Sequence, residues 1–207
     1  MKRKMICALV VLSVLLASMS TITSTRAADY SKVGVKQGDW AEYAVSSTGH
    51  TWNKARLDIT GVSGARANLS LTIYYPNGTI AGTETGYANV TSGNVPYWMI
   101  APNLNKDDLI YPASSNKIND TAQMIVAGAT RTVNRLVWSS YGNLAWEWDR
   151  TTGLTIRFYI SDGGWDNYTM TATNMWLPDW VLPVVIGGAV GAVALIAVAV
   201  VIIRRRR

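Results

Sequence analysis

The side chains most able to do chemistry in this sequence are a few neighbouring carboxylates and a single histidine. Asp107 and Asp108 end an oxygen-rich run, and Asp162 and Asp166 flank a Gly-Gly pair. Such oxygen ligands can hold calcium, but the run has Asp where an EF-hand loop needs Gly and Ser where it needs Glu. His50 has no Gly-x-Ser-x-Gly motif beside it, which argues against a hydrolase triad. We therefore expect no catalytic residue, no metal site and no cofactor.

Tripeptides of the form Asn-x-Ser/Thr are the second group of chemically relevant residues. There are five, none with Pro in the middle, and they begin at Asn68, Asn77, Asn89, Asn119 and Asn167. In secreted domains this tripeptide is the acceptor for N-linked glycans. Asn68 and Asn167 fall on the polar faces of expected strands and Asn77 falls on an expected turn, where a sugar would disturb no packing. The sequence therefore predicts a glycoprotein.

The C-terminal end predicts a membrane anchor. Residues 181–203 carry no charge. A helix rises about 1.5 Å per residue, so this segment is long enough to cross a hydrocarbon core of about 30 Å. A basic stop-transfer sequence follows at once, made of Arg204, Arg205, Arg206 and Arg207. Within the helix, Gly187 and Gly191 form a Gly-x-x-x-Gly pair that would allow a weak homodimer.

The N-terminal end predicts a secretory signal peptide over residues 1–27. Three basic residues precede an apolar run that is short for a membrane span, and small residues lead to a cleavage site before Ala28. Cleavage after Ser20 and an uncleaved N-terminal helix are the alternatives. With the C-terminal anchor, this predicts a single-pass type I protein of the cell membrane. Residues 28–176 would be extracellular, residues 177–180 a juxtamembrane linker and the C-terminus cytoplasmic.

The basic net charge belongs to the two ends. The chain has a formal charge of +6 and a pI near 9.5, which alone would suggest a nucleic-acid partner. Eight basic residues lie in the signal peptide and the C-terminal stop, so the expected ectodomain is slightly acidic. We expect no nucleic-acid binding. The only cysteine, Cys7, lies in the signal peptide, so the mature protein would contain no disulfide.

Between the two ends, apolar and polar residues alternate with a period of two, and Gly, Pro, Asn and Asp mark the turns. Residues 67–75 alternate in this way and end in a Pro-Asn-Gly turn at 76–78. A second hairpin is expected through 149–153 and a third through 162–164. About eight to ten strands are expected, which predicts an all-β, antiparallel sheet that closes into a barrel, half-barrel or sandwich, followed by one transmembrane helix.

Tryptophan and tyrosine are abundant and phenylalanine is nearly absent, with 9 Trp, 10 Tyr and 1 Phe. Trp40, Trp146 and Trp148 occupy regular strand positions, so we expect them to pack in or across the sheet. Trp and Tyr also suit interfaces and sugar-stacking surfaces. Trp176 and Trp180 directly precede the apolar helix, where indole rings favour the membrane interface.

The chain resembles a broad group of uncharacterised archaeal exported surface proteins with one β-rich ectodomain. The resemblance lies in the order of the segments GVKQGDWAEY, LDITGVSGARANLSL, NGT, MIAPNL with DDLIY, RTVNRL and WDRTTGL. The tail, LPDWVLP with an apolar helix and RRRR, is similar to the sorting signals of archaeosortase substrates, whose helix is removed and replaced by a lipid. Its prolines are spaced differently, and a permanent helix is the simpler interpretation.

Three functions remain open on this basis. The first is a non-enzymatic cell-surface module with a structural role in the envelope, or one that binds a glycan, protein or other surface ligand. The second is a carrier or sensor of an apolar ligand in a curved sheet, which a deep apolar cavity would favour and a filled interior would exclude. The third is an extracellular hydrolase, which would need a cleft that joins carboxylates such as Asp107 and Asp162.

Overall fold

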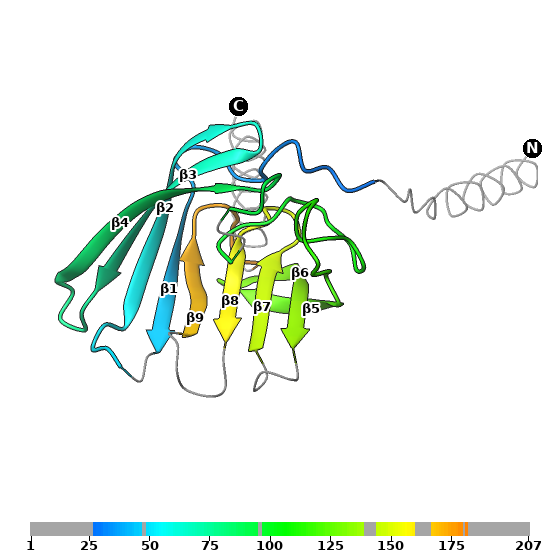
Figure 1. Ribbon diagram of the computed structural model, residues 1–207. Helices are drawn as coiled ribbons and strands as arrows, with labels where there is room; N and C mark the ends of the chain where they lie inside the picture. Colours follow the sequence, from blue (N-terminus) through cyan, green and yellow to red (C-terminus); the bar gives the residue numbers. More distant parts are fainter. Residues whose placement is uncertain are drawn as a thin grey trace, which may run out of the picture.

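The computed structural model describes residues 27–46, 49–94, 97–138, 144–159, 167–179 and 181. These residues form nine strands that belong to one antiparallel sheet. The strands are β1 (Trp40–Ser46), β2 (Lys54–Ser63), β3 (Arg66–Tyr74), β4 (Ile80–Asn89), β5 (Asp120–Val126), β6 (Ala129–Trp138), β7 (Leu144–Asp149), β8 (Thr155–Tyr159) and β9 (Asn167–Thr173). The order across the sheet is β4-β3-β2-β1-β9-β8-β7-β6-β5 (Figure 1). The all-β prediction is therefore confirmed.

The first half of the sheet follows directly from the alternation in the sequence. In β3, Ala67 and Leu69 are buried, whereas Asn68 between them is exposed. The turn after β3 closes with a hydrogen bond from the backbone N–H of Tyr75 to the carbonyl of Thr79, and Gly78 in this turn has a φ of 83°. A positive φ is accessible to glycine at little cost, so the predicted Pro-Asn-Gly hairpin is confirmed.

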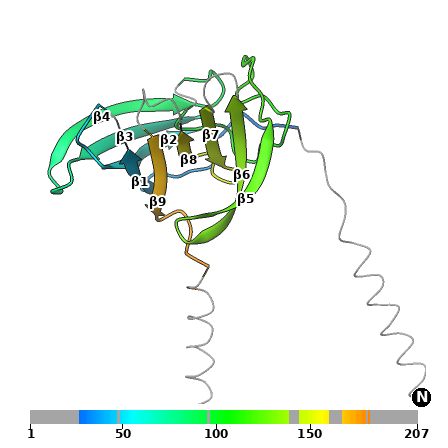
Figure 2. The ribbon, with the colours of Figure 1, turned by 90° about the horizontal axis from the view of Figure 1, so that it is seen from below.

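The sheet is curved but open, with β4 at one edge and β5 at the other (Figures 1 and 2). The expected closed barrel and the expected two-sheet sandwich are therefore both wrong. Figure 2 shows that the β5–β6 hairpin bends away from β4 and reaches the segment that follows β9. Its turn accepts a backbone hydrogen bond there, from the N–H of Asp179 to the carbonyl of Gly128. In this position the hairpin does not pair with β4, and the barrel stays open.

The hydrophobic core lies on the concave face of this sheet. Strands β1 to β3 contribute alternate residues, and the long connection between β4 and β5 packs over the other half (Figure 1). The buried apolar residues of the connection are Val90, Met99, Ile100, Ala101, Leu104, Ile110 and Ile118. Backbone hydrogen bonds join this connection to the β7–β8 turn, from Ile100 N–H to Gly153 O and from Asn103 N–H to Arg150 O.

Gly153 allows this close approach. Its φ is 71°, and a Cβ atom at this position would lie 2.0 Å from the carbonyl oxygen of Ile100. Only glycine fits without a shift of the backbone, because both the conformation and the space exclude a side chain. The β7–β8 turn therefore positions the connection over the concave face.

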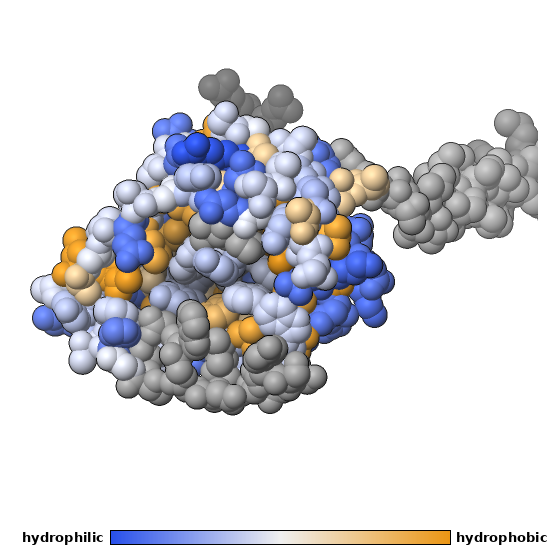
Figure 3. Space-filling view, viewed as in Figure 1, coloured by the Kyte–Doolittle hydropathy of each residue, from blue (hydrophilic) through white to orange (hydrophobic). Residues whose placement is uncertain are grey.

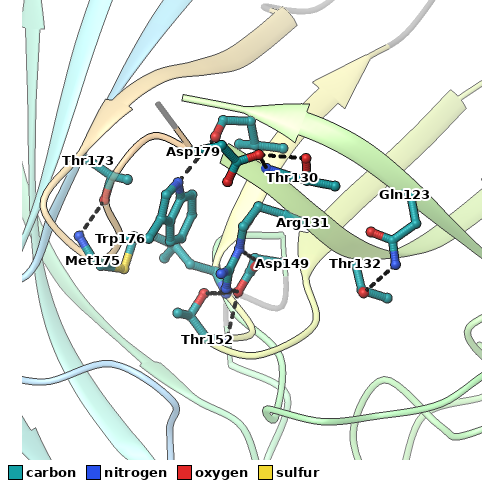
Figure 4. Close-up of polar contacts among 12 residues, drawn as sticks. Gln123, Thr130, Arg131, Thr132, Asp149, Thr152, Thr173, Met175, Trp176 and Asp179 are labelled. Carbon is teal, nitrogen blue, oxygen red and sulfur yellow. Dashed lines mark hydrogen bonds and ion pairs between the residues drawn. The ribbon is translucent and has the colours of Figure 1, made fainter. Parts of the chain in front are cut away.

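The segment after β9 packs against the β5–β6 turn, and we call this contact the C-terminal clasp, formed by residues 176–179 and 126–131 (Figure 4). The indole Nε1 of Trp176 donates to the carbonyl of Val126 at 3.1 Å. The carboxylate of Asp179 accepts hydrogen bonds from the backbone N–H and the hydroxyl of Thr130, at 2.9 and 2.7 Å. The guanidinium of Arg131 lies 4.5 Å from the centre of the Trp176 ring. The indole of Trp176, expected at a membrane interface, thus contacts the domain.

Candidate functional site

The concave face holds a pocket of about 380 Å³ beside the β4–β5 connection. Figure 3 shows this face of the molecule hollowed, with apolar side chains on its β4 side. The pocket is lined by Tyr97, Trp98, Trp146, Thr155, Phe158 and Tyr168. These residues come from the connection and from β7, β8 and β9, so strands far apart in the sequence build one site.

The aromatic lining consists of two groups. In the first, the ring of Trp98 meets that of Tyr168 edge-on at 5.3 Å and that of Tyr43 at 5.6 Å. In the second, Trp146 stacks on Phe158 at 5.2 Å and on Tyr97 at 6.2 Å. Edge-to-face and offset arrangements of this kind are the favourable geometries for aromatic pairs. The rings therefore support one another, and the pocket between them is largely preformed.

No charged side chain lines this pocket among the described residues, and the hydroxyl of its one threonine is already engaged. The hydroxyl of Thr155 donates to the carbonyl of Tyr97, and the hydroxyl of Tyr43 donates to the carbonyl of Thr155 at 2.7 Å. Burial raises the pKa of Tyr43, so this phenol stays neutral. The Nε1 of Trp146 is buried and has no hydrogen-bond partner in the described part of the chain. The lining is therefore mostly apolar, and its other polar side-chain groups are the hydroxyls of Tyr97 and Tyr168 and the indole N–H of Trp98.

Two smaller hollows adjoin the pocket. One, of about 130 Å³, shares Tyr97 and Trp146 with it and reaches Trp138 and Trp148. The other, of about 170 Å³, shares Trp98 and extends along β3 and β4 to Glu84. The three hollows together form an aromatic surface across the concave face, with a carboxylate only at its β4 end among the described lining residues.

Charged residues on the opposite face of β6, β7 and β8 hold the wall of the pocket in place. Behind Trp146, the fully buried Glu147 accepts hydrogen bonds at one oxygen from Arg135 at 2.9 Å and from Arg157 at 2.7 Å. These three residues are direct neighbours across the strands. A buried carboxylate needs such partners, since an unpaired charge in this place would be strongly unfavourable. The network therefore fixes the register of the strands that carry the aromatic side chains.

Asp107 and Asp108, two of the carboxylates singled out in the sequence, lie in the turn-rich connection between β4 and β5. Asp108 accepts a hydrogen bond from the backbone N–H of Asn105 at 2.7 Å and so closes a turn. Asp107 has a φ of 73° in that turn, and its N–H donates to the carbonyl of Ile118. Within the described residues, no cluster of three or more His, Cys, Asp or Glu is arranged to hold a metal ion. His50 stacks on Trp52 with the ring centres 3.8 Å apart.

The five predicted glycosylation sites occupy different environments. Asn68, Asn77 and Asn119 are exposed, and Asn89 and Asn167 are partly buried. Asn77 and Asn89 lie at the two ends of the edge strand β4, and Asn119 directly precedes the other edge strand, β5. All five residues remain predicted acceptors of N-linked glycans. Four of them lie on or beside the two hairpins at the edges of the sheet, β3–β4 and β5–β6.

Other predicted elements lie outside the described residues. These are the signal peptide up to Arg26, Trp180, Asp162, Asp166, the apolar segment from residue 182, Gly187, Gly191 and the four terminal arginines. In the described part of the chain, no helix has the length and apolar character needed to span a bilayer.

The pocket residues Trp98, Phe158 and Tyr168 were not identified from the sequence as one site. The available signal was the enrichment in Trp and Tyr, which shows that aromatic surface is plentiful but not where it converges. No protein-family model matches this chain, and no curated protein matches it. The site is therefore interpreted from its own geometry.

Proposed function

We propose that this protein is a membrane-anchored, non-enzymatic module of the cell surface whose concave pocket binds an uncharged apolar ligand. The observation that carries the proposal is the pocket of about 380 Å³, lined by aromatic side chains and one threonine. Burial of apolar ligand surface in such a lining is favourable by about 25 cal/mol per Å². A charged ligand would lose its hydration there without gaining a partner. The volume is also in the usual range for small-molecule sites, about 300–1,000 Å³.

An apolar ligand fits this pocket better than a glycan does. Sugars stack on aromatic rings, but their hydroxyl groups also need hydrogen-bond partners when they leave water. The hydroxyls of Thr155 and Tyr43 are already bound to backbone carbonyls. The remaining polar groups of the lining, on Tyr97, Trp98 and Tyr168, are few for the several hydroxyls of a sugar ring. A largely apolar molecule matches the site more closely.

Hydrolysis is not supported by the arrangement of the carboxylates. A glycoside hydrolase needs two carboxyl groups about 5–10 Å apart across the scissile bond. Of the described residues that line the three hollows, only Glu84 is a carboxylate. The proposal therefore assigns binding and no catalytic step to the concave face.

The proposal can be tested by photolabelling of the full chain in lipid nanodiscs with a neutral trifluoromethyl-phenyldiazirine probe. Peptide mapping should place the adducts on segments that contain Trp98, Phe158 and Tyr168, and excess dodecanol should reduce them. Trp98→Ala should lower this labelling several-fold. Trp40→Ala is the matched control, because Trp40 lies under Arg56, with the guanidinium 4.5 Å from its ring, and outside the pocket.

Two results would contradict an apolar ligand. The first is labelling spread equally over both faces of the sheet, which would indicate that the pocket has no preference for the probe. The second is protection by a chitin oligosaccharide but not by dodecanol, which would favour a glycan-binding module.

A further inference from the structure

We propose that the tip of the β5–β6 hairpin, residues 124–129, lies in the surface of the bilayer and forms a second membrane contact beside the C-terminal anchor. This inference rests on the membrane anchoring proposed above. It concerns a surface on the far side of the domain from the pocket, and its partner is a lipid surface.

The tip has a composition that suits lipid. Residues 124–129 read Met-Ile-Val-Ala-Gly-Ala, without one polar or charged side chain. Ile125 leaves 80% of its surface exposed, which is unusual for a branched apolar residue at the end of a hairpin. Leu177, in the segment that packs against this turn, is 62% exposed. Val126 and Ala129 are buried, so Ile125 and Leu177 supply the exposed apolar surface of the hairpin tip and the segment packed on it.

The C-terminal clasp places this tip where the chain would enter the membrane. Asp179 is held at the turn by its N–H, which donates to the carbonyl of Gly128 at 2.9 Å. The uncharged segment begins at Val181, two residues later. Consecutive Cα atoms are 3.8 Å apart, so the start of the anchor lies within about 8 Å of Asp179. A hairpin tip tied to this point must lie close to the lipid headgroups.

The charged groups around the tip do not oppose contact with lipid. Arg131 is turned inward, where it pairs with Asp149 and lies against Trp176 (Figure 4). Asp179 is exposed, and its carboxylate accepts two hydrogen bonds from Thr130. Residues 124–129 themselves carry no charge, and Ile125 is the side chain that they expose most.

The test uses a fluorescent label at one position of the full chain in a Cys7→Ser background. Cys7 is the only cysteine, so Ile125→Cys can be labelled alone with an NBD dye. The protein is then placed in phosphatidylcholine vesicles with or without brominated acyl chains. We expect blue-shifted emission and at least a two-fold loss of intensity on bromination. Ile80→Cys is the matched control, because Ile80 is 62% exposed on the opposite edge strand, and its label should be unaffected.

Flotation of the vesicles separates this inference from the anchoring on which it rests. Protein that does not float with the vesicles would refute the anchoring and with it the second contact. Protein that floats, but whose label at position 125 behaves like that at position 80, would overturn only the second contact. Blue-shifted emission that bromination does not quench would also overturn it, because it would indicate contact with a second copy of the chain. Thr130→Val, which removes one clasp hydrogen bond, should weaken the quenching at position 125.

Discussion

Arg131 and Asp149 form an ion pair through two contacts, with the guanidinium Nε 2.7 Å from Oδ2 and Nη2 3.1 Å from Oδ1. The carboxylate is fully buried and also accepts hydrogen bonds from the backbone N–H and hydroxyl of Thr152. The same guanidinium lies under the ring of Trp176. One buried carboxylate thus connects β6, the β7–β8 turn that supports the pocket, and the segment after β9.

Removal of this carboxylate should be strongly destabilising. Asp149→Ala leaves Arg131 partly buried without its partner, and we expect a loss of about 3–5 kcal/mol in the free energy of unfolding. Asp58→Ala is the control, because the Arg56–Asp58 pair is partly exposed and should contribute no more than about 1 kcal/mol. Urea unfolding of the full chain in mild detergent, followed by tryptophan fluorescence, measures both. Equal losses in the two variants would contradict the prediction.

Two glycines with positive φ allow the cost of backbone strain to be measured separately from the cost of a steric clash. Gly38 has a φ of 88°, and nothing lies within 4 Å of an added Cβ. Gly38→Ala should therefore lower the free energy of unfolding only through backbone strain, by about 1–2 kcal/mol. Gly153→Ala adds a clash with the carbonyl of Ile100, and we expect a further loss of about 1–3 kcal/mol. The same variant should reduce diazirine labelling, because the connection that carries Trp98 must shift. The prediction fails if Gly153→Ala is no less stable than Gly38→Ala.

The clasp should weaken in acid. Hydrogen bonds from the side chain and the backbone N–H of Thr130 lower the pKa of Asp179 below its ordinary value of 3.8. A carboxyl whose pKa is lowered by folding stabilises the fold above its unfolded pKa, and this stabilisation is lost as the pH falls through the folded pKa. The stability difference between the wild type and Asp179→Asn should therefore be constant near neutral pH and shrink below 3.8. Denaturation at a series of pH values measures it, and a difference that is unchanged in acid would refute the assignment.

The predicted glycosylation sites should differ in occupancy. Asn77 lies in an exposed turn, and its Oδ1 accepts hydrogen bonds from Thr79, so these contacts do not use the amide nitrogen that carries a glycan. The amide nitrogen of Asn119 donates to the carbonyl of Val137 at 2.7 Å. We expect higher occupancy at Asn77 than at Asn119 when the protein is made in a host with N-glycosylation. Glycopeptide mass spectrometry measures the ratio, and the reverse order would contradict this interpretation.

The strands and their faces could be predicted from the sequence because they depend on neighbouring residues. The alternation through Ala67 and Leu69 and the turn at Gly78 are enough to predict the β3–β4 hairpin. The strand pairs β6–β7 and β7–β8 depend in the same way on local pattern, with Trp146 and Trp148 on one face and Glu147 on the other. In each case one buried face determines the register.

Closure of the sheet and convergence of the pocket could not be predicted in this way, because they depend on contacts between distant segments. The unpaired edges β4 and β5 and the contact between Gly128 and Asp179 are both long-range features, which local alternation does not encode. The pocket requires Trp98 from the connection to meet Tyr168 from β9. The position of Trp98 over the sheet depends in turn on the missing side chain of Gly153.

The open order of the strands has a consequence for the width of the space on the concave face. In a closed barrel, the strand number and the stagger of the hydrogen bonds fix the radius, so the interior has one size. Here β4 and β5 lie at opposite ends of the strand order, and no ring of backbone hydrogen bonds sets the curvature. The width of the space over the concave face is therefore set by the β4–β5 connection, whose backbone is hydrogen-bonded to the β7–β8 turn and to Thr155 at the start of β8. In this open sheet a loop has the role that the stagger of the strands has in a barrel.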